Sequence, residues 1–240
     1  MPCLNKLPEI TLAFWVMKIC ATTLGETAGD LLSMTLGLGY ATSSVVLLAV
    51  FLATLTTQLA ARRLHPLLFW TVILSTSTAG TTLSDYMDRT LGLGYATGAL
   101  LLSALLALVL AVWRTVEGTV AMNAIHTRRA EIFYWGAILV SNTLGTALGD
   151  FLADDSGLGF SGGALLISSI LAIVAALSRW THWSRVALFW SAFVLTRPLG
   201  ATLGDVLTKP QAHGGLDLGT AGASTVLLLV LAVLVLRVRR

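Results

Sequence analysis

Charged residues are scarce in this chain. Asp, Glu, Lys and Arg together make up 11% of its 240 residues, whereas an average soluble domain has about 25%. So few charges could not cover the surface of a soluble fold. Two cysteines are too few for a secreted disulfide scaffold, and a net charge of +3 is modest for a nucleic-acid binder. Because 56% of the residues are hydrophobic, the class that remains is a polytopic membrane protein.

Apolar runs of membrane-spanning length occur eight times along the chain. A spanning helix needs about 20 mostly apolar residues, and two of the eight runs each contain one base, Lys18 and Arg197. The expected helices cover residues 10–29, 38–61, 66–84, 90–113, 132–149, 156–178, 186–204 and 218–236. We therefore expect an all-α membrane protein with eight transmembrane helices, which form one transmembrane domain over residues 1–240.

The eight helices form four copies of one sequence pattern. Each copy carries a Trp and a Gly at fixed distances before an Asp, as Trp15 and Gly25 precede Asp30. The repeats cover approximately residues 10–62, 66–114, 130–179 and 185–238. Three copies continue with GLGY or GLGF, which predicts a tight turn before the second helix, and the fourth has a longer connection. Since each helical hairpin contains an even number of helices, the four repeats should share one orientation in the membrane.

This pattern resembles a bacterial integral-membrane family that is defined by four tandem two-helix repeats of unknown function. The resemblance covers about residues 10–237, and it implies a bacterial inner-membrane protein without supplying an activity. The distribution of basic residues also predicts how the chain is oriented in the membrane. Most bases lie at the termini or between the repeats, and the turns within the repeats hold only Arg89 and Lys209. By the positive-inside rule, both termini are expected to be cytoplasmic.

The two helices of each repeat differ in composition. The second helices are apolar all round, which is typical of a lipid-facing layer. The first helices carry a stripe of small and polar residues that lets helix backbones approach closely, and we expect them to form an inner bundle. Helix packing alone could explain the glycines of this stripe, but it does not require an Asp in every copy. The Trp of each repeat is expected in an aromatic belt at the cytoplasmic membrane interface.

The acids of the first helices are candidate ligands for a hard cation, because such ions take oxygen ligands. The stripe contains no His or Cys, which argues against zinc or copper. An alternative is that each Asp lies at the outer end of its helix, in contact with water, and caps the following turn. The candidate metal ligands are Asp30, Asp85, Asp150, Asp205, Glu26 and Asn142.

Lys18 and Arg197 are candidate ion-pair or gating residues. Neither is expected to face lipid, and Glu26 and Asp30 are the nearest acids to Lys18. Four Asp and Glu26 against these two bases leave a formal excess of three negative charges, which favours a cation over an anion. The competing interpretation makes both bases structural counter-ions that lock the bundle.

The leading functional hypothesis is transport of a small cation, either a divalent metal such as manganese or a proton-coupled ion. No cofactor is expected apart from a bound divalent cation, and the expected partners are the lipid bilayer and the ion, with homo-oligomerisation left open. The alternative is a non-transporting membrane scaffold or sensor that binds a partner membrane protein. We do not expect an enzyme, because no His or Ser/Lys constellation lies at membrane depth.

Overall fold

The computed structural model describes residues 7–211 and 214–238 and is all-helical in that part of the chain. Three π-helical turns, η1 (Leu31–Thr35), η2 (Tyr86–Thr90) and η4 (Phe151–Asp155), and one 3₁₀ turn, η3 (Met122–Ala124), connect the long helices. The long helices are α1 (Leu12–Asp30), α2 (Tyr40–Ala60), α3 (Pro66–Asp85), α4 (Tyr95–Glu117), α5 (Arg128–Asp150), α6 (Gly159–Trp180), α7 (Arg185–Thr208) and α8 (Thr220–Val238).

Helices α1, α3, α5 and α7 form a closed inner ring, in which each packs against two others in the order α1, α3, α5, α7 and back to α1. This confirms the inner bundle that the small-residue stripes predict. A residue on one helix often meets a glycine on the next, and a Cβ added at Gly25 would overlap Ser77 of α3. Likewise a Cβ at Gly200 would overlap Thr22 of α1. The glycines are therefore needed for the close approach of the four helices.

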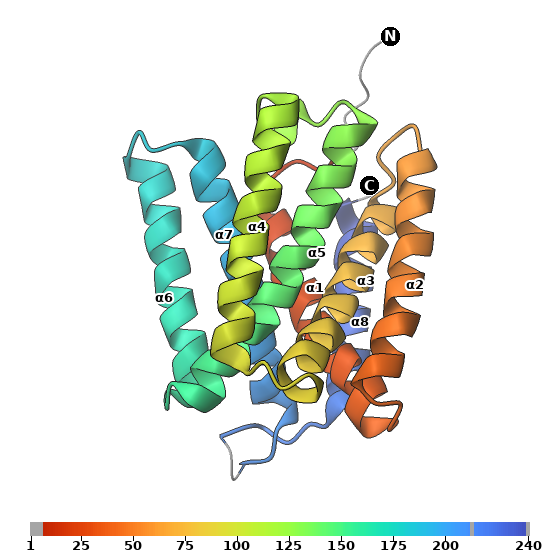
Figure 1. The fold of residues 1–240 in the computed structure, drawn as a ribbon, viewed down its shortest axis with the longest axis vertical. Helices are drawn as coiled ribbons and strands as arrows, with labels where there is room; N and C mark the ends of the chain where they lie inside the picture. The colour runs from red at the N-terminus through yellow and green to blue at the C-terminus, as the bar shows by residue number, and fades with distance from the viewer. Residues whose placement is uncertain (1–6, 212–213, 239–240) are drawn as a thin grey trace.

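The outer helices do not cover the inner helix of their own repeat. Helix α2 packs along α3, α4 along α5, α6 along α7, and the last helix α8 returns to cover α1 (Figure 1). The two helices of a repeat are thus joined at one end, but each outer helix has its main partner in another repeat. This interlocking makes the four copies one packed unit.

The tight turns predicted at the GLGY and GLGF motifs are present. In the first copy Gly37 and Gly39 have positive φ angles of 69° and 74°, a region that glycine adopts without steric cost. The backbone N–H of Gly39 donates to the carbonyl of Ser33 at 3.0 Å, and α2 begins at the next residue. In the fourth copy α7 runs on without a π-helical turn to Thr208, and a longer connection leads to α8.

Six helices of the described chain are long and apolar enough to cross a membrane: α2, α4, α5 with η4, α6, α7 and α8. The chain is therefore consistent with a multi-pass membrane protein. Helices α1 and α3 are not among the six, because they carry many polar side chains, but these side chains are buried among the other helices. The expected position of the termini lies partly outside the described residues, since residues 1–6 and 239–240 are not described.

Candidate functional site

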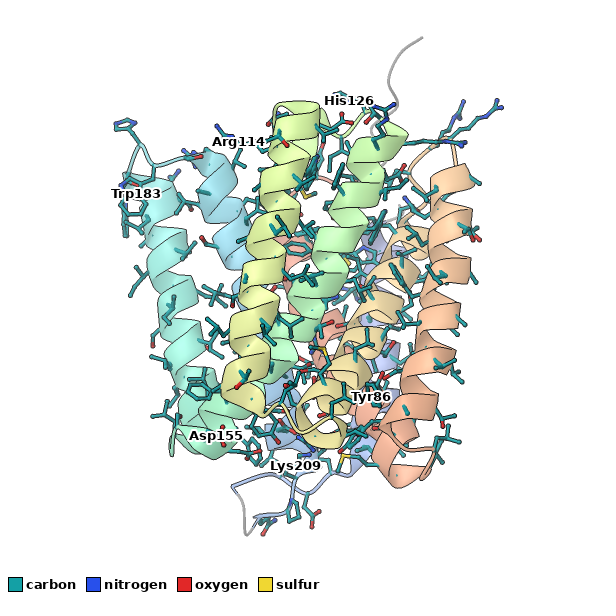
Figure 2. All side chains as sticks on the ribbon, viewed as in Figure 1. Tyr86, Arg114, His126, Asp155, Trp183 and Lys209 are labelled. Atoms are coloured by element: carbon teal, nitrogen blue, oxygen red, sulfur yellow. The ribbon has the colours of Figure 1, made fainter. Side chains whose placement is uncertain are left out.

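The four repeat aspartates lie together at one end of the inner ring, which we call the acid end. Asp30, Asp85 and Asp150 are the last residues of α1, α3 and α5, and Asp205 lies in the last turn of α7. All four side chains are buried, with at most 4% of each residue exposed. Figure 2 shows Lys209 and Tyr86 at this end and Arg114, His126 and Trp183 at the opposite end. The carboxylates are thus not solvated one by one, as the capping alternative requires.

Two bases connect the aspartates in pairs. Arg89 places Nε 3.1 Å from Asp85 Oδ1 and Nη2 3.1 Å from Asp150 Oδ2. Lys209 places Nζ 3.4 Å from Asp30 Oδ2 and 3.2 Å from Asp205 Oδ1. Each pair joins two different repeats, so the acid end is held together by ion pairs between helices.

Sequence reasoning missed Arg89 and Lys209 as site residues. Each stands four residues after a repeat Asp, a spacing that places two helical side chains on one face, and this signal could have identified them. Adding these two bases to Lys18 and Arg197 leaves five carboxylates against four bases. The predicted formal excess of three negative charges therefore falls to one when these two bases are counted.

The charges of these two bases are stabilised by their partners. Burial alone would lower the pKa of Lys209, but the carboxylates of Asp205 and Asp30 raise it above its ordinary value. Burial likewise opposes the charge of Arg89, and Asp85 and Asp150 raise its pKa above the usual range. The paired carboxylates thus favour the charged form of both bases.

Closer to the middle of the ring, Arg197 of α7 forms an ion pair with Glu26 of α1, which we call the axial tie. Nη1 of Arg197 lies 3.0 Å from Oε2 of Glu26, and the Arg197 side chain is fully buried. A buried guanidinium requires both a counter-charge and hydrogen-bond acceptors. The pairing expected for Arg197 with an acid of the inner bundle is therefore confirmed, although the acid comes from another repeat.

The axial tie contacts all four inner helices, which places it at the centre of the ring. Oε2 of Glu26 also accepts hydrogen bonds from the hydroxyls of Thr81 on α3 and Thr146 on α5, both at 3.2 Å. The guanidinium of Arg197 donates to the carbonyl of Thr22 at 3.3 Å, the carbonyl of Ser77 at 3.2 Å, the hydroxyl of Thr146 at 2.8 Å, and the hydroxyl of Thr81.

Lys18 and Asn142 differ from expectation. The Lys18 side chain is fully buried, yet its Nζ has no hydrogen-bond partner among the residues that the structure describes and lies 4.2 Å from the centre of the Phe193 ring. The expected pairing with Glu26 or Asp30 is therefore absent within this part of the chain, because those acids lie two or more helical turns away. Asn142 donates from Nδ2 to the hydroxyl of Thr76 at 2.9 Å, which ties α5 to α3.

At the end opposite the aspartates, the repeat tryptophans form a closed circuit with the aromatic residue that precedes each of them. We call this circuit the aromatic ring. The contacts between neighbouring repeats join Phe14 to Trp70, Phe69 to Trp135, Tyr134 to Trp190 and Phe189 to Trp15, with ring centroids 5.6, 5.6, 6.4 and 5.8 Å apart.

Three of the four repeat tryptophans differ from the exposed positions that an interfacial belt requires. Trp70, Trp135 and Trp190 are buried between the inner helices, whereas Trp15 is partly exposed. Trp113 of α4 is buried as well and makes an edge-to-face contact with Trp190, with ring centroids 5.8 Å apart. Their size and stacking preference make them packing elements of the bundle.

Three acids come close enough to share one cation. Glu26, Asp150 and Asp205 each offer one carboxylate oxygen, and these oxygens lie within 4.8 Å of one another. All three residues are buried. A second carboxylate oxygen of Asp85 is buried without a hydrogen-bond partner within the described chain, so the same end holds a further free oxygen. Of the six ligands expected from sequence, three thus form a compact group, and Asp30, Asp85 and Asn142 lie outside it. All five acids are paired with a base, and Asn142 is bonded to Thr76.

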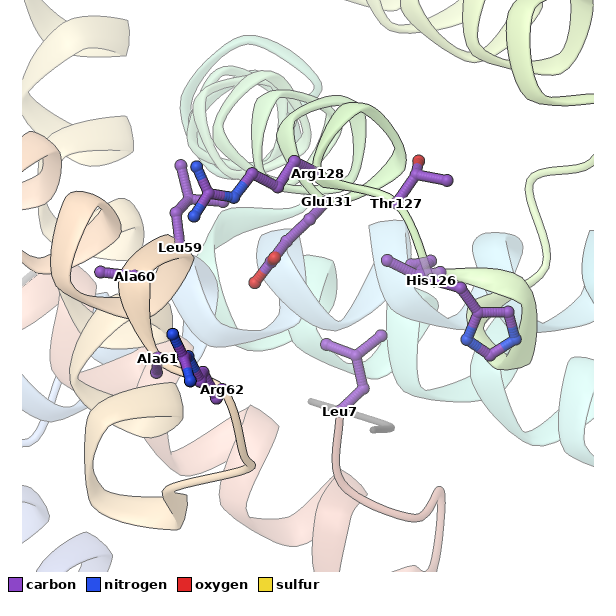
Figure 3. Close-up of a pocket in the computed structure, with 10 residues that line it drawn as sticks. Leu7, Leu59, Ala60, Ala61, Arg62, His126, Thr127, Arg128 and Glu131 are labelled. Atoms are coloured by element: carbon purple, nitrogen blue, oxygen red, sulfur yellow. The ribbon is translucent and has the colours of Figure 1, made fainter. Parts of the chain in front are cut away.

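Two hollows of the structure lie away from these acids. One of about 480 Å³ is at the opposite end of the bundle, where Figure 3 shows Glu131 pointing into the hollow with Arg62 and Arg128 at its rim. The other, about 530 Å³, is an apolar groove on the outer surface between α1, α6 and α7. Neither is lined by the aspartates or by the axial tie.

Comparison with known proteins gives one match. The model of the family described as Repeat of Unknown Function (DUF347) matches the chain four times, over residues 13–64, 68–119, 133–183 and 188–240. These four segments correspond to the four repeats that sequence reasoning delimits. No curated protein and no solved structure matches the chain.

Proposed function

This chain belongs to the family of the Repeat of Unknown Function (DUF347), and we propose that it is a membrane transporter for a small cation with eight spanning helices. Six helices have the length and composition to cross a membrane. We add α1 and α3 because they are two of the four helices of the inner ring, where neighbouring helices and not lipid surround their polar side chains.

We place the protein in a bacterial inner membrane with the acid end on the outer side and the opposite end in the cytoplasm. The support is the distribution of bases: Arg62, Arg63, Arg128, Arg129 and Arg185 lie in or beside the connections between repeats, at the end that carries the aromatic ring. Excess Lys and Arg in short loops favours the cytoplasmic side.

The observation that carries the proposal is the approach of Glu26, Asp150 and Asp205, whose carboxylate oxygens lie within 4.8 Å. Each of the three carboxylates is already paired with a base, Glu26 with Arg197, Asp150 with Arg89 and Asp205 with Lys209. A metal ion that binds the group therefore has to compete with these bases for carboxylate oxygens. An all-oxygen site suits Mg²⁺, Ca²⁺ or Mn²⁺ better than zinc or copper. We therefore propose a divalent cation such as Mn²⁺ as the transported ion and a proton as its competitor on Glu26 or an Asp.

The closed ends of the bundle suit one conformation of an alternating-access cycle. Arg89 and Lys209 lie across the acid end, and the aromatic ring lies at the opposite end of the inner helices. Glu26 belongs both to the axial tie and to the group of three acids. A cation or proton on Glu26 would weaken its pairing with Arg197, which gives a physical link between binding and opening of the ring.

The scaffold alternative also has an observation in its favour. The axial tie joins all four inner helices through a dense set of hydrogen bonds, and a permanent lock of this kind would suit a protein that only presents its outer surface to a partner. The two functions differ in whether purified protein moves ions.

The deciding experiment is ion flux into proteoliposomes that contain the purified protein, tested with Mn²⁺, Ca²⁺, Mg²⁺ and H⁺. We expect Mn²⁺ flux in the wild type and a loss of at least tenfold in Asp150→Asn, because one of three ligand carboxylates is neutralised. The matched control is Asp154→Asn, an exposed acid one turn further on that is not part of the group. Folded wild-type protein that moves none of the ions would contradict transport and leave the scaffold function.

A further inference from the structure

The two bases at the acid end are held very differently. Arg89 makes two ion pairs, donates from Nη1 to the hydroxyl of Tyr40 at 3.1 Å, and lies over the rings of Tyr40 and Tyr95. Lys209 has ion pairs with Asp30 and Asp205 only, at the longer distances of 3.4 and 3.2 Å. Arg89 is thus fixed by carboxylates, a hydroxyl and two aromatic rings, whereas the Lys209 ammonium is held by two carboxylates, Asp30 and Asp205, and donates a hydrogen bond to Asp30.

Lys209 is also placed where its side chain can leave. It follows the last residue of α7 and begins the connection to α8, and 24% of its side chain is exposed. Its partners Asp30 and Asp205 have only 6% and 4% of their side chains exposed. A lysine ammonium is a compact point charge on a flexible stem, so rotation of that stem moves the charge from between the carboxylates to solvent.

Asp205 is shared between Lys209 and the proposed cation site. Its Oδ1 binds Nζ of Lys209, and one of its oxygens lies within 4.8 Å of oxygens from Glu26 and Asp150. The free oxygen of buried Asp85 at the same end shows that the acids there are not all satisfied by the two bases. A cation that takes Asp205 as a ligand therefore competes with Lys209 for it.

We propose that Lys209 is a tethered cation which occupies the outer part of the binding site, and that an incoming divalent ion binds Asp205 by displacing the Lys209 ammonium into solvent. This inference rests on the proposed function, because it uses the same carboxylates. In this role Lys209 lowers the affinity of the site for cations and makes the site select divalent over monovalent ions. A doubly charged ion competes better with one ammonium group for the carboxylate of Asp205. The equivalent base Arg89 remains in place and keeps α3 and α5 together.

The first test is Mn²⁺ binding to the purified protein in detergent, by isothermal titration. We expect Lys209→Met to tighten Mn²⁺ binding by about tenfold or more, the size expected when a nearby competing charge is removed. The matched control is Arg63→Met, which removes the same charge from an exposed position in the α2–α3 connection at the opposite end; it should bind like the wild type. Unchanged or weaker binding by Lys209→Met, with Mn²⁺ binding intact in the wild type, overturns the tethered-cation role and leaves transport standing.

The second test uses the wild type alone, so it does not depend on the folding of a variant. The chain has three lysines, Lys6, Lys18 and Lys209, and peptide mass spectrometry can follow each after brief reaction with an amine-acetylating reagent. We expect saturating Mn²⁺ to raise the labelling rate of Lys209 several-fold and to leave buried Lys18 unlabelled. Mn²⁺ binding without a change at Lys209 contradicts the proposal, and absence of Mn²⁺ binding contradicts the cation site itself.

Discussion

The acid end and the aromatic ring are built from equivalent positions of the same four repeats, yet they differ in symmetry. The aromatic ring keeps the same kind of contact between every pair of neighbouring repeats. At the acid end, two repeats carry a base, Arg89 or Lys209. The other two repeats have Met34 and Asp154 at the equivalent positions. Apolar rings can be repeated four times without penalty, whereas four buried carboxylates repel one another. The charged layers thus require different residues in different copies.

The axial tie shows the same rule in the middle of the bundle. Arg197 occupies the position that is Thr22, Ser77 or Asn142 in the other repeats. Glu26 occupies the position of Thr81 in the next repeat. The base Arg197 and the acid Glu26 thus stand at different repeat positions in different copies. The closed ring brings the two side chains together at its centre.

The largest effect is expected from breaking the axial tie. Arg197→Met leaves Glu26 buried without its counter-charge, and we expect a loss of about 3–5 kcal/mol in the free energy of unfolding, measured by denaturant unfolding in mixed micelles. The double variant Arg197→Met/Glu26→Met removes both charges and should regain most of that stability. A double variant as unstable as the single one would show that the ion pair is not the source of the effect.

A loss of similar size, but of apolar origin, is expected in the aromatic ring. Trp135 is fully buried and contacts Phe69 in a tilted arrangement, so Trp135→Ala should cost about 3–5 kcal/mol through lost packing. Trp135→Phe keeps an aromatic contact and should cost less than half as much. Because no charge is involved, both losses should be the same at low and high salt, measured in the same unfolding assay. A strong salt dependence would contradict a packing role for this ring.

The smallest effect concerns the close approach of the inner helices, which both ends share. A Cβ at Gly80 of α3 would lie 2.9 Å from backbone atoms of Asn142 and Thr143 on α5, so Gly80→Ala should destabilise the protein by about 1–3 kcal/mol. The matched control is Gly136→Ala, since nothing lies within 4 Å of a Cβ there and alanine favours helix. Equal stability of the two variants would contradict tight packing between α3 and α5.

Much of the architecture could be predicted from the residues. The helices end close to the predicted residues, because apolar runs, the repeat Asp and the GLGY motifs bound them. The small residues beside Gly25 and Gly200 predicted which helices form the inner bundle, since close packing needs them. The covering of each inner helix by an outer helix of another repeat was not predictable, because all outer helices are similarly apolar.

The candidate site was predicted less completely. The acids were found because charged residues stand out in apolar helices. The partners were not, because an ion pair such as that of Lys209 with Asp30 joins residues far apart in the sequence. Lys18 was assigned an acid on its own helix, but its side chain lies over Phe193 of another helix.

The amino-acid sequence alone determined four repeats, eight helices and the identity of the polar inner faces, because hydrophobic length and periodicity are local properties that each segment carries by itself. Only the tertiary structure decided which charges meet. Closing the ring brings α7 against α1, and that contact joins Arg197 to Glu26 and Lys209 to Asp30. The energy of a charge inside a membrane protein depends on its neighbours in space, and these neighbours come from four different segments of the chain.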